Sequence, residues 1–240
     1  MLLGGLQKAT LVDYPGKVAC TIFTVGCNFF CPFCHNKDLV SLKNFKQSSL
    51  SFIKEKDFFD FLLTRQQVLD GVCITGGEPT IQPDLAIFCQ KIKNLDFLVK
   101  LDTNGGQPKI IKHLIEQKLI DFIALDVKVN KDNYYLLTNT SYQKIAHSLK
   151  IILSGSIDYQ LRTTLVPKIH NEDNLLILAK ELKSAAIENG VDPNSLSWQL
   201  QRFRPQNCLK KEFDKLSPFS DQEFERLVLA AQSVIPQVAA

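Results

Sequence analysis

The run Val18–His35 reads VACTIFTVGCNFFCPFCH and joins an apolar, β-branched stretch to three closely spaced cysteines. Its first part, Val18–Thr24, has the composition of a buried strand. Cys27, Cys31 and Cys34 follow with the spacing C-x3-C-x2-C. An iron–sulfur cluster normally takes four cysteine ligands. Three thiolates in one loop can therefore hold a [4Fe–4S] cluster and leave its fourth iron open for chemistry.

The cysteine spacing alone leaves other kinds of site open. Cys31-Pro32-Phe33-Cys34 matches the dithiol of a glutaredoxin-type oxidoreductase, and with His35 it matches the attachment pattern of c-type haem. The three cysteines with His35 also form the donor set of a Cys3His zinc site. The dithiol leaves Cys27 without a role, and haem attachment requires export. Adjacent Cys34 and His35 point awkwardly for one tetrahedral ion. The pattern therefore favours the cluster.

Strand-like and helix-like stretches alternate along the chain. Apolar, β-branched runs predict strands at Val18–Thr24, Val72–Thr75, Phe97–Leu101, Phe122–Val127, Tyr159–Val166 and Leu196–Phe203. A helical period of apolar residues predicts helices at Phe52–Leu69, Leu85–Ile92, Ile110–Leu119, Tyr142–Leu153, Leu175–Glu188 and Asp221–Val234. Ser220 is the expected N-cap of the last helix. The middle of Lys37–Gln47 and the segment Lys210–Ser217 are expected to be exposed loops. About six β/α units predict an α/β fold with mostly parallel strands and outer helices.

Polar residues fall where the predicted strands end. Different strands deliver Cys27, Glu78, Asp102, Asp126 and Arg162. In barrels of parallel strands, the carboxyl-terminal strand ends build the active site. We therefore expect these side chains to share one rim.

A second motif, Thr75-Gly76-Gly77-Glu78-Pro79, follows the strand that begins at Val72. Gly-Gly and Pro are the usual residues of a plain turn. Two glycines can equally expose backbone to a ligand. Backbone carbonyls and Glu78 could then accept hydrogen bonds from an ammonium group. The motif alone does not decide between a turn and a binding site.

Composition excludes several classes of protein. The chain has 240 residues, of which 45% are hydrophobic and 22% charged, as in ordinary globular proteins. A net charge of +3 gives no indication of a nucleic-acid or membrane partner. Met1–Gly5 lacks the charged region of a signal peptide, and no apolar run approaches the ~18 residues of a membrane span. We therefore expect a cytoplasmic protein, in which the seven cysteines are ligands, redox groups or buried thiols.

Together, the cysteine and Gly-Gly-Glu-Pro motifs resemble those of the radical S-adenosylmethionine (SAM) superfamily. The flanking segments Gly4–Lys8, GGLQK, and Val12–Lys17, VDYPGK, are similar to activating proteins of anaerobic ribonucleoside-triphosphate reductase. The chain also resembles the pyruvate formate-lyase activating enzyme. The resemblance implies a partial (β/α)6 TIM-like barrel. We expect a single radical SAM domain over residues 1–240, with its core at about 15–205 and a helical tail at about 206–240.

The resemblance also implies a role for each matching residue. Cys27, Cys31 and Cys34 would hold the cluster, whose open iron would chelate SAM. The other matching positions would bind SAM. Phe33 would lie beside the adenine, and Gly76, Gly77 and Glu78 would bind the methionyl amine. The residues around the rest of the molecule would be Asp102, Asn104, Asp126, Lys128 and Arg162. A monovalent cation near Asp102 and Asp126 is a further implication.

Four of these residues also have plain structural interpretations. Asp126 and Lys128 can form a surface salt bridge, and Arg162, placed inside an apolar strand, can pair with a neighbouring carboxylate. Phe33 can be an ordinary core aromatic, and Trp198 and Phe203 on the last strand are most simply core. These alternatives stay open at the level of sequence.

The function implied by the resemblance is reductive cleavage of SAM followed by formation of a glycyl radical on a partner enzyme. The partner would be anaerobic ribonucleoside-triphosphate reductase, and a flavodoxin- or ferredoxin-like protein would donate the electron. The first alternatives are activation of pyruvate formate-lyase or another glycyl-radical enzyme, and a radical SAM enzyme acting on a small molecule. A non-catalytic zinc or redox protein is the least favoured. We expect no catalytic residue beyond the cluster and SAM, since the chemistry needs no general acid or base.

Overall fold

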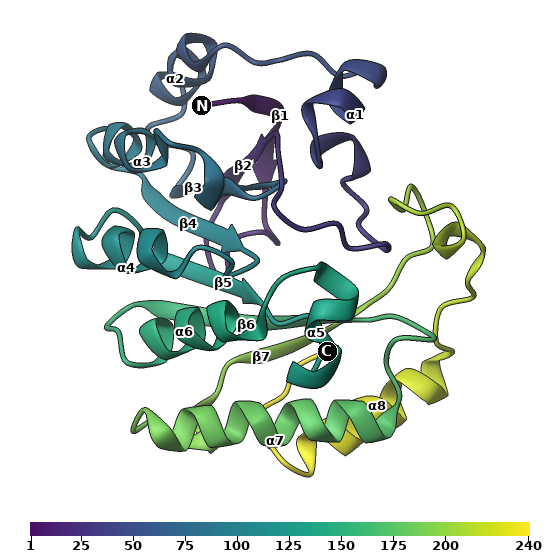
Figure 1. The fold of residues 1–240 in the computed structure, drawn as a ribbon. Helices are drawn as coiled ribbons and strands as arrows, with labels where there is room; N and C mark the ends of the chain where they lie inside the picture. Colours follow the sequence, from purple (N-terminus) through teal and green to yellow (C-terminus); the bar gives the residue numbers. More distant parts are fainter. The chain divides into compact units, whose positions relative to one another are not determined.

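The computed structural model describes residues 1–240, and its elements alternate as the sequence predicts (Figure 1). Seven strands form a sheet in the order β1-β2-β3-β4-β5-β6-β7. Their bounds are β1 Leu3–Thr10, β2 Ala19–Thr24, β3 Gly71–Gly76, β4 Leu98–Thr103, β5 Phe122–Asp126, β6 Asp158–Leu165 and β7 Trp198–Arg202. The pairs β2–β3, β3–β4 and β6–β7 are parallel, while β1 is antiparallel to β2. The predicted α/β fold with mostly parallel strands is confirmed.

Helices connect the strands. The α-helices are α1 Leu42–Gln47, α2 Glu55–Leu63, α3 Leu85–Lys93, α4 Pro108–Glu116, α5 Lys131–Thr138, α6 Tyr142–Leu153, α7 Glu172–Glu188 and α8 Asp221–Gln232. Short 3-10 helices are η1 Lys37–Leu39, η2 Pro79–Ile81, η3 Pro193–Ser195 and η4 Phe213–Lys215. Ser220 caps α8 as predicted, since its side chain accepts the Glu223 N–H in a capping box.

The six predicted strands and six predicted α-helices are present, and one strand and two α-helices were not predicted. These are the edge strand β1, whose glycines weaken a strand signal, and the short helices α1 and α5. The middle of Lys37–Gln47 was expected to be an exposed loop, and the structure shows only a short connection there, with Ser41 between η1 and α1. Helix α1 begins at Leu42 and buries Phe45. The prediction of a helix from Phe52 to Leu69 is too long. Ile53 bridges to Leu3 in extended conformation, so α2 begins only at Glu55 and ends at Leu63.

The chain divides into two compact units, and the division falls within β5. Unit 1 contains residues 1–28, 36–103 and 109–124. Its parallel strands are in register, with Cys20 opposite Val72 and Val72 opposite Val99. Outside these strands Phe58 of α2 stacks on Phe88 of α3, with ring centroids 5.4 Å apart. This buried apolar framework fixes where β3 and β4 end.

Unit 2 contains residues 29–35, 104–108 and 125–240. Its strands β6 and β7 pair with Leu161 opposite Trp198, and its helices α7 and α8 lie side by side (Figure 1). Trp198 is buried, and its indole N–H donates to Thr163 Oγ1 at 3.0 Å. Trp198 and Phe203 are core residues, as expected from their place on the last strand.

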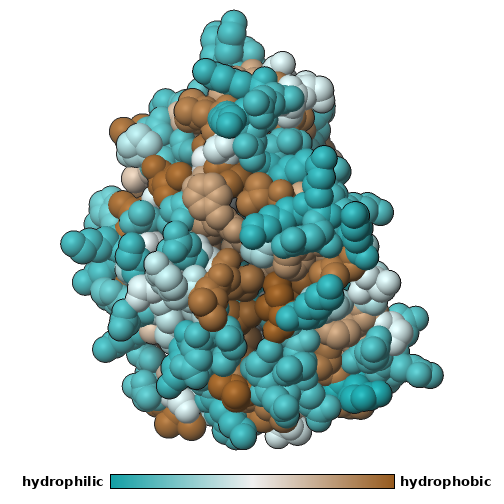
Figure 2. Space-filling model, turned by 45° about the vertical axis from the view of Figure 1, so that its right-hand side comes forward, coloured by the Kyte–Doolittle hydropathy of each residue, from teal (hydrophilic) through white to brown (hydrophobic).

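Hydrophobic side chains reach the surface among the hydrophilic ones (Figure 2). Val12 and Leu136 are each 84% exposed. Single exposed hydrophobic residues such as these two are usual in folded proteins. None of the helices combines the length and apolar character required to cross a membrane.

Candidate functional site

The cysteine loop begins in unit 1, at the end of β2. The backbone N–H of Gly26 donates to Leu39 O at 2.8 Å, and that of Cys27 donates to Val40 O at 2.9 Å. These bonds hold the residue before the loop and the first cysteine against the turn of η1. Cys27 is half-buried and its thiol is not in a disulfide. Its backbone is therefore fixed while its side chain keeps some access.

The Gly76-Gly77-Glu78 turn packs on the same segment of unit 1. A Cβ on Gly77 would lie 2.1 Å from Gly26 O, and one on Gly76, with φ of +115°, would lie 2.3 Å from Thr24 N. The Glu78 N–H donates to Gly26 O at 2.7 Å. Both glycines are thus required by the close approach of two backbones. This structural reason was not among the two that the sequence suggested.

Glu78 is 1% exposed, and its carboxylate is held by hydroxyl and amide donors. Thr103 Oγ1 donates to Glu78 Oε1 at 2.6 Å, and the Thr80 N–H donates to the same oxygen at 3.1 Å. Buried carboxylates require such partners. The network fixes one carboxylate oxygen of Glu78 at the ends of β3 and β4.

Asp102, near the end of β4, pairs with a lysine that the sequence analysis did not single out. The Lys100 ammonium forms an ion pair with Asp102 Oδ1, and the side chains are 2% and 13% exposed. The signal was present, because a lysine inside the apolar strand LVKLDT needs a buried partner. Lys100 and Asp102 lie two residues apart and hence on one face of the strand.

In unit 2, Asp126 at the end of β5 joins two cations. Lys128 Nζ donates to Asp126 Oδ2 at 2.9 Å, and Arg162 Nε of β6 donates to Asp126 Oδ1 at 2.8 Å. The structure thus brings three predicted site residues together. It also contains the two ion pairs that the simpler interpretations predict, namely Asp126 with Lys128 and Arg162 with a neighbouring carboxylate.

The electrostatics of this trio follow from its geometry. Burial alone would raise the pKa of Asp126, but the Arg162 guanidinium and the Lys128 ammonium outweigh it and hold that pKa well below its usual range. Burial likewise works to lower the pKa of Lys128, and Asp126 outweighs it and holds that pKa well above its usual range. All three groups are therefore charged at neutral pH, and together they carry one net positive charge.

His170 holds the backbone of Lys128, one member of this trio, in place. It is 4% exposed, and its Nδ1 accepts the Val166 N–H at 3.0 Å. Nδ1 therefore carries no proton, so Nε2 carries it and donates to Lys128 O at 2.9 Å. Burial lowers the pKa of His170 and keeps the ring neutral. The ring ties the loop after β6 to the backbone of Lys128.

The rest of the cysteine loop lies in unit 2 under the C-terminal segment. Phe33 is 6% exposed and its ring centroid lies 6.5 Å from that of Phe213. The Lys210 N–H donates to Pro32 O at 2.9 Å. The segment Lys210–Ser217 was predicted as an exposed loop, and this prediction missed its contacts with the cysteine loop and the turn of η4. Phe33 is buried, as its simpler interpretation requires.

Asn104, the remaining predicted site residue, shapes the turn after β4. It is 6% exposed, and its Oδ1 accepts the Gly106 N–H at 2.8 Å. This is the local side-chain bond with which Asn typically closes a turn. A role for Asn104 toward SAM stays a prediction.

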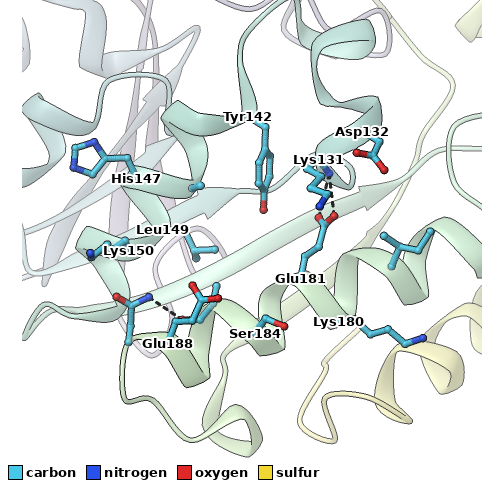
Figure 3. A pocket seen from close by; sticks show the side chains of 14 residues that line it. Lys131, Asp132, Tyr142, His147, Leu149, Lys150, Lys180, Glu181, Ser184 and Glu188 are labelled. Atoms are coloured by element: carbon cyan, nitrogen blue, oxygen red, sulfur yellow. Dashed lines mark hydrogen bonds between the residues drawn. The ribbon is translucent and has the colours of Figure 1, made fainter.

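A pocket of about 790 Å³ in unit 2 lies elsewhere, on outer helices (Figure 3). Tyr142 of α6 and Glu181 of α7 line it, and Glu181 accepts the Lys131 N–H at 3.1 Å. Its lining includes none of the predicted site residues. Three lysines and three carboxylates line it, so neither charge is in excess and its chemistry indicates no particular ligand.

Comparison with known proteins assigns the family. A model of the radical SAM superfamily matches residues 21–180. A candidate glycyl-radical enzyme activating enzyme of Methanocaldococcus jannaschii is 33% identical over 246 aligned residues, which cover 99% of this chain and 94% of the relative. This chain belongs to the radical SAM superfamily, among the glycyl-radical-enzyme activating enzymes.

A second relative and a solved structure are also similar to this chain. The pyruvate formate-lyase-activating enzyme of Clostridium pasteurianum is 27% identical over 190 residues, which cover 75% of each chain. The crystal structure of Streptococcus suis SuiB bound to its precursor peptide SuiA superimposes with a TM-score of 0.64 at 16% identity. It covers 90% of this chain and 45% of SuiB. The latter likeness concerns the fold alone, and it agrees with the partial barrel that the family resemblance implies.

Radical SAM enzymes carry a [4Fe–4S] cluster and use SAM, and the surroundings of Cys31 fit a cluster ligand. Burial raises the pKa of Cys31 to about 11, while the Lys128 ammonium lowers it. A thiolate here requires positive charge, which a metal supplies. The Tyr134 hydroxyl is fully buried and has no hydrogen-bond partner. Burial raises its pKa, and Cys31 is the next cause. Sulfur at Cys31 would offer this donor an acceptor.

A monovalent cation fits less well. The two carboxylates that would bind it are already matched by protein cations, Asp102 by Lys100 and Asp126 by Lys128 and Arg162. A metal ion at either carboxylate would meet like charge at close range.

Proposed function

We propose that this radical SAM activating enzyme generates the glycyl radical of an anaerobic ribonucleoside-triphosphate reductase, with a flavodoxin- or ferredoxin-like protein as electron donor. Membership among the glycyl-radical-enzyme activating enzymes supports a protein partner of this class. The preference for the reductase rests on the segments GGLQK and VDYPGK. In the second of these, Tyr14 is 3% exposed and Asp13 Oδ2 accepts the Thr21 hydroxyl at 2.6 Å.

The observation that carries the proposal is the positively charged trio of Asp126, Lys128 and Arg162 beside buried Cys31. Lys128 and Arg162 can attract the carboxylate of SAM. Asp126 fixes both cations in position, and His170 fixes the backbone of Lys128. The trio therefore offers a preorganised site for an anionic group.

In unit 1, we assign recognition of the methionyl ammonium to the Gly76-Gly77-Glu78 turn. Glu78 is held on one oxygen by Thr80 and Thr103, so its orientation is fixed before SAM binds. Cys27, Cys31 and Cys34 would hold the cluster, which when bound supplies the electron for reductive cleavage of SAM. We assign Phe33 to the adenine.

The decisive experiment is anaerobic reconstitution with iron and sulfide, followed by incubation with SAM, a reductant and a partner enzyme. We expect roughly four irons per chain and a glycyl-radical signal in electron paramagnetic resonance with the anaerobic reductase. Cys27→Ala should lose the cluster absorbance and SAM cleavage together, while Cys89→Ala, which changes a buried helix cysteine, should keep both.

Each other outcome identifies a different function. A radical on pyruvate formate-lyase but not on the reductase would reassign the partner. Cleavage of SAM without a radical on any partner enzyme would favour a small-molecule substrate. One zinc per chain and no iron would show that the site is not an iron–sulfur centre.

A further inference from the structure

Lys100 occupies an unusual place for a lysine, in the middle of the buried strand β4. It is 1% exposed and lies between Val99 and Leu101, which are both fully buried. Its ammonium lies 3.8 Å from Cys73 Sγ on β3 and 5.9 Å from the centroid of the Phe122 ring. Burying an ammonium is costly unless a charge compensates it. Asp102 supplies that charge.

The register of β3 and β4 determines which side chains lie beside the Lys100 ammonium. Cys73 lies directly opposite Lys100 in the parallel register of β3 and β4, so the thiol flanks the ammonium. Asp102 is two residues further along β4 and lies on the same face. The ammonium thus has a single fixed position, at Asp102 and close to the carboxyl-terminal end of the strand.

We propose that the Lys100 ammonium takes the place of a monovalent metal ion at Asp102, so that this enzyme binds SAM without Na⁺ or K⁺. The proposal rests on the proposed function and on the role in binding SAM that the family resemblance implies for Asp102. A compact point charge that donates several hydrogen bonds is a chemical substitute for such an ion. Asp126 does not restore the need for a metal, because Lys128 and Arg162 already compensate it.

The proposal differs from an ordinary buried salt bridge in what removal of the lysine does. If Lys100 only stabilises the fold, Lys100→Met should destabilise the protein equally in every salt. If its ammonium stands in for a metal ion, the variant leaves a vacated cation position next to Asp102. Small monovalent cations should then bind there and restore what was lost, whereas a bulky organic cation should not.

Thermal melting of the anaerobically reconstituted protein tests this without SAM. In NaCl, KCl and choline chloride at equal ionic strength, we expect the wild type to melt within about 1 °C of the same temperature, since general screening is then constant. Lys100→Met should melt about 5 °C or more below the wild type in choline chloride and recover at least half of that loss in NaCl or KCl.

The control variant is Lys100→Met combined with Asp102→Asn, which removes both charges. It should fold even if the single variant does not, because it buries no unpaired charge. Its melting temperature should be the same in the three salts. Any preference for Na⁺ or K⁺ in this double variant would place the metal ion elsewhere and overturn the proposal.

Binding of SAM, measured by equilibrium dialysis, supplies the second test. We expect the affinity of the wild type to change less than about twofold when Na⁺ or K⁺ replaces choline. The affinity of Lys100→Met should fall about tenfold or more in choline and recover in Na⁺ or K⁺. A wild-type affinity that depends on Na⁺ or K⁺, or a melting loss equal in all salts, would refute the proposal. Absence of SAM binding in every salt would instead refute the proposed function, and the melting result would still decide the role of Lys100.

Discussion

Two strand-end carboxylates, one in each unit, are paired with a lysine two residues away in sequence, yet the two pairs are built differently. In unit 1 the lysine precedes the carboxylate, and Lys100 lies inside β4 with its side chain 2% exposed. In unit 2 the lysine follows, and Lys128 lies beyond the end of β5 with its side chain 17% exposed. Asp126 also pairs with Arg162, whereas Lys100 is the cation that compensates the charge of Asp102.

The difference shows that the position of a lysine relative to its strand determines whether its charge is available to a ligand. A lysine inside the strand is surrounded by apolar neighbours and serves mainly its carboxylate. A lysine past the strand end sits at the rim, where together with Arg162 it leaves a net positive charge for a ligand. The same two residue types therefore produce a neutral pair in unit 1 and a positively charged trio in unit 2.

The largest expected effect comes from removing each carboxylate in turn. Asp102→Ala should lower the free energy of unfolding by about 3 kcal/mol, because Lys100 would remain buried without its partner. Asp126→Ala should cost less, about 2 kcal/mol, because Lys128 and Arg162 are more exposed to water. Urea denaturation of both variants measures this difference.

Asp60→Ala is the matched control for this pair of variants. It removes the partner of Lys56 in an exposed pair of α2, where both side chains are mostly in water. We expect no measurable change in stability from it. Equal losses in Asp102→Ala and Asp126→Ala would show that strand position does not decide the strength of these pairs.

How far the sequence predicted this site depends on the kind of residue. Asp126 and Arg162 were singled out because polar residues at strand ends stand out against apolar strands, whereas Lys128 was named through the resemblance to the family. Lys100 was missed, although a lysine within LVKLDT carried the same kind of signal. The sequence shows a charge in an apolar run, but the partner depends on register, and the register of β3 and β4 is set by long-range pairing.

The elements of the fold also differ in how well the sequence predicts them. Strands with continuous apolar runs were predicted to within two residues at each end, because a strand that is buried on both faces has an apolar composition. Strand β1 was missed because its sequence, LGGLQKAT, has neither a continuous run nor a clear alternation. It exists because it pairs with β2, which no local pattern reveals. Gly76 and Gly77 similarly depend on contacts with Thr24 and Gly26 that local sequence cannot show.

A second, smaller effect should appear in the dependence of stability on pH. The folded state holds the pKa of Asp126 below its unfolded value of about 3.9, so the unfolded state binds more protons as pH falls. The contribution of Asp126 is therefore present above about pH 4 and is lost below it. The stability difference between the wild type and Asp126→Asn should shrink by up to about 1.4 kcal/mol per pH unit below that point.

Urea denaturation of the wild type and of Asp126→Asn between pH 3 and pH 7 measures this difference. A difference between the wild type and Asp126→Asn that stays constant over this range would mean that Asp126 is not held ionised by Lys128 and Arg162.

The smallest effect concerns His170, which supports the rim lysine but has no equivalent beside Lys100 in the described contacts. His170→Phe should cost about 1 kcal/mol, because the Val166 N–H and Lys128 O lose their partner. The ring is neutral when folded and its pKa is lowered, so its contribution is present above about pH 6.5 and is lost as pH falls. Denaturation at pH 5 and pH 7.5 should show a stability difference between wild type and variant that is smaller at pH 5.

His147→Phe, which alters an exposed histidine of α6, should show no such narrowing of the stability difference. If the difference instead widened toward pH 5, the protonated ring would be the folded form, and the assigned bond from Nε2 to Lys128 O could not be the one that holds the rim.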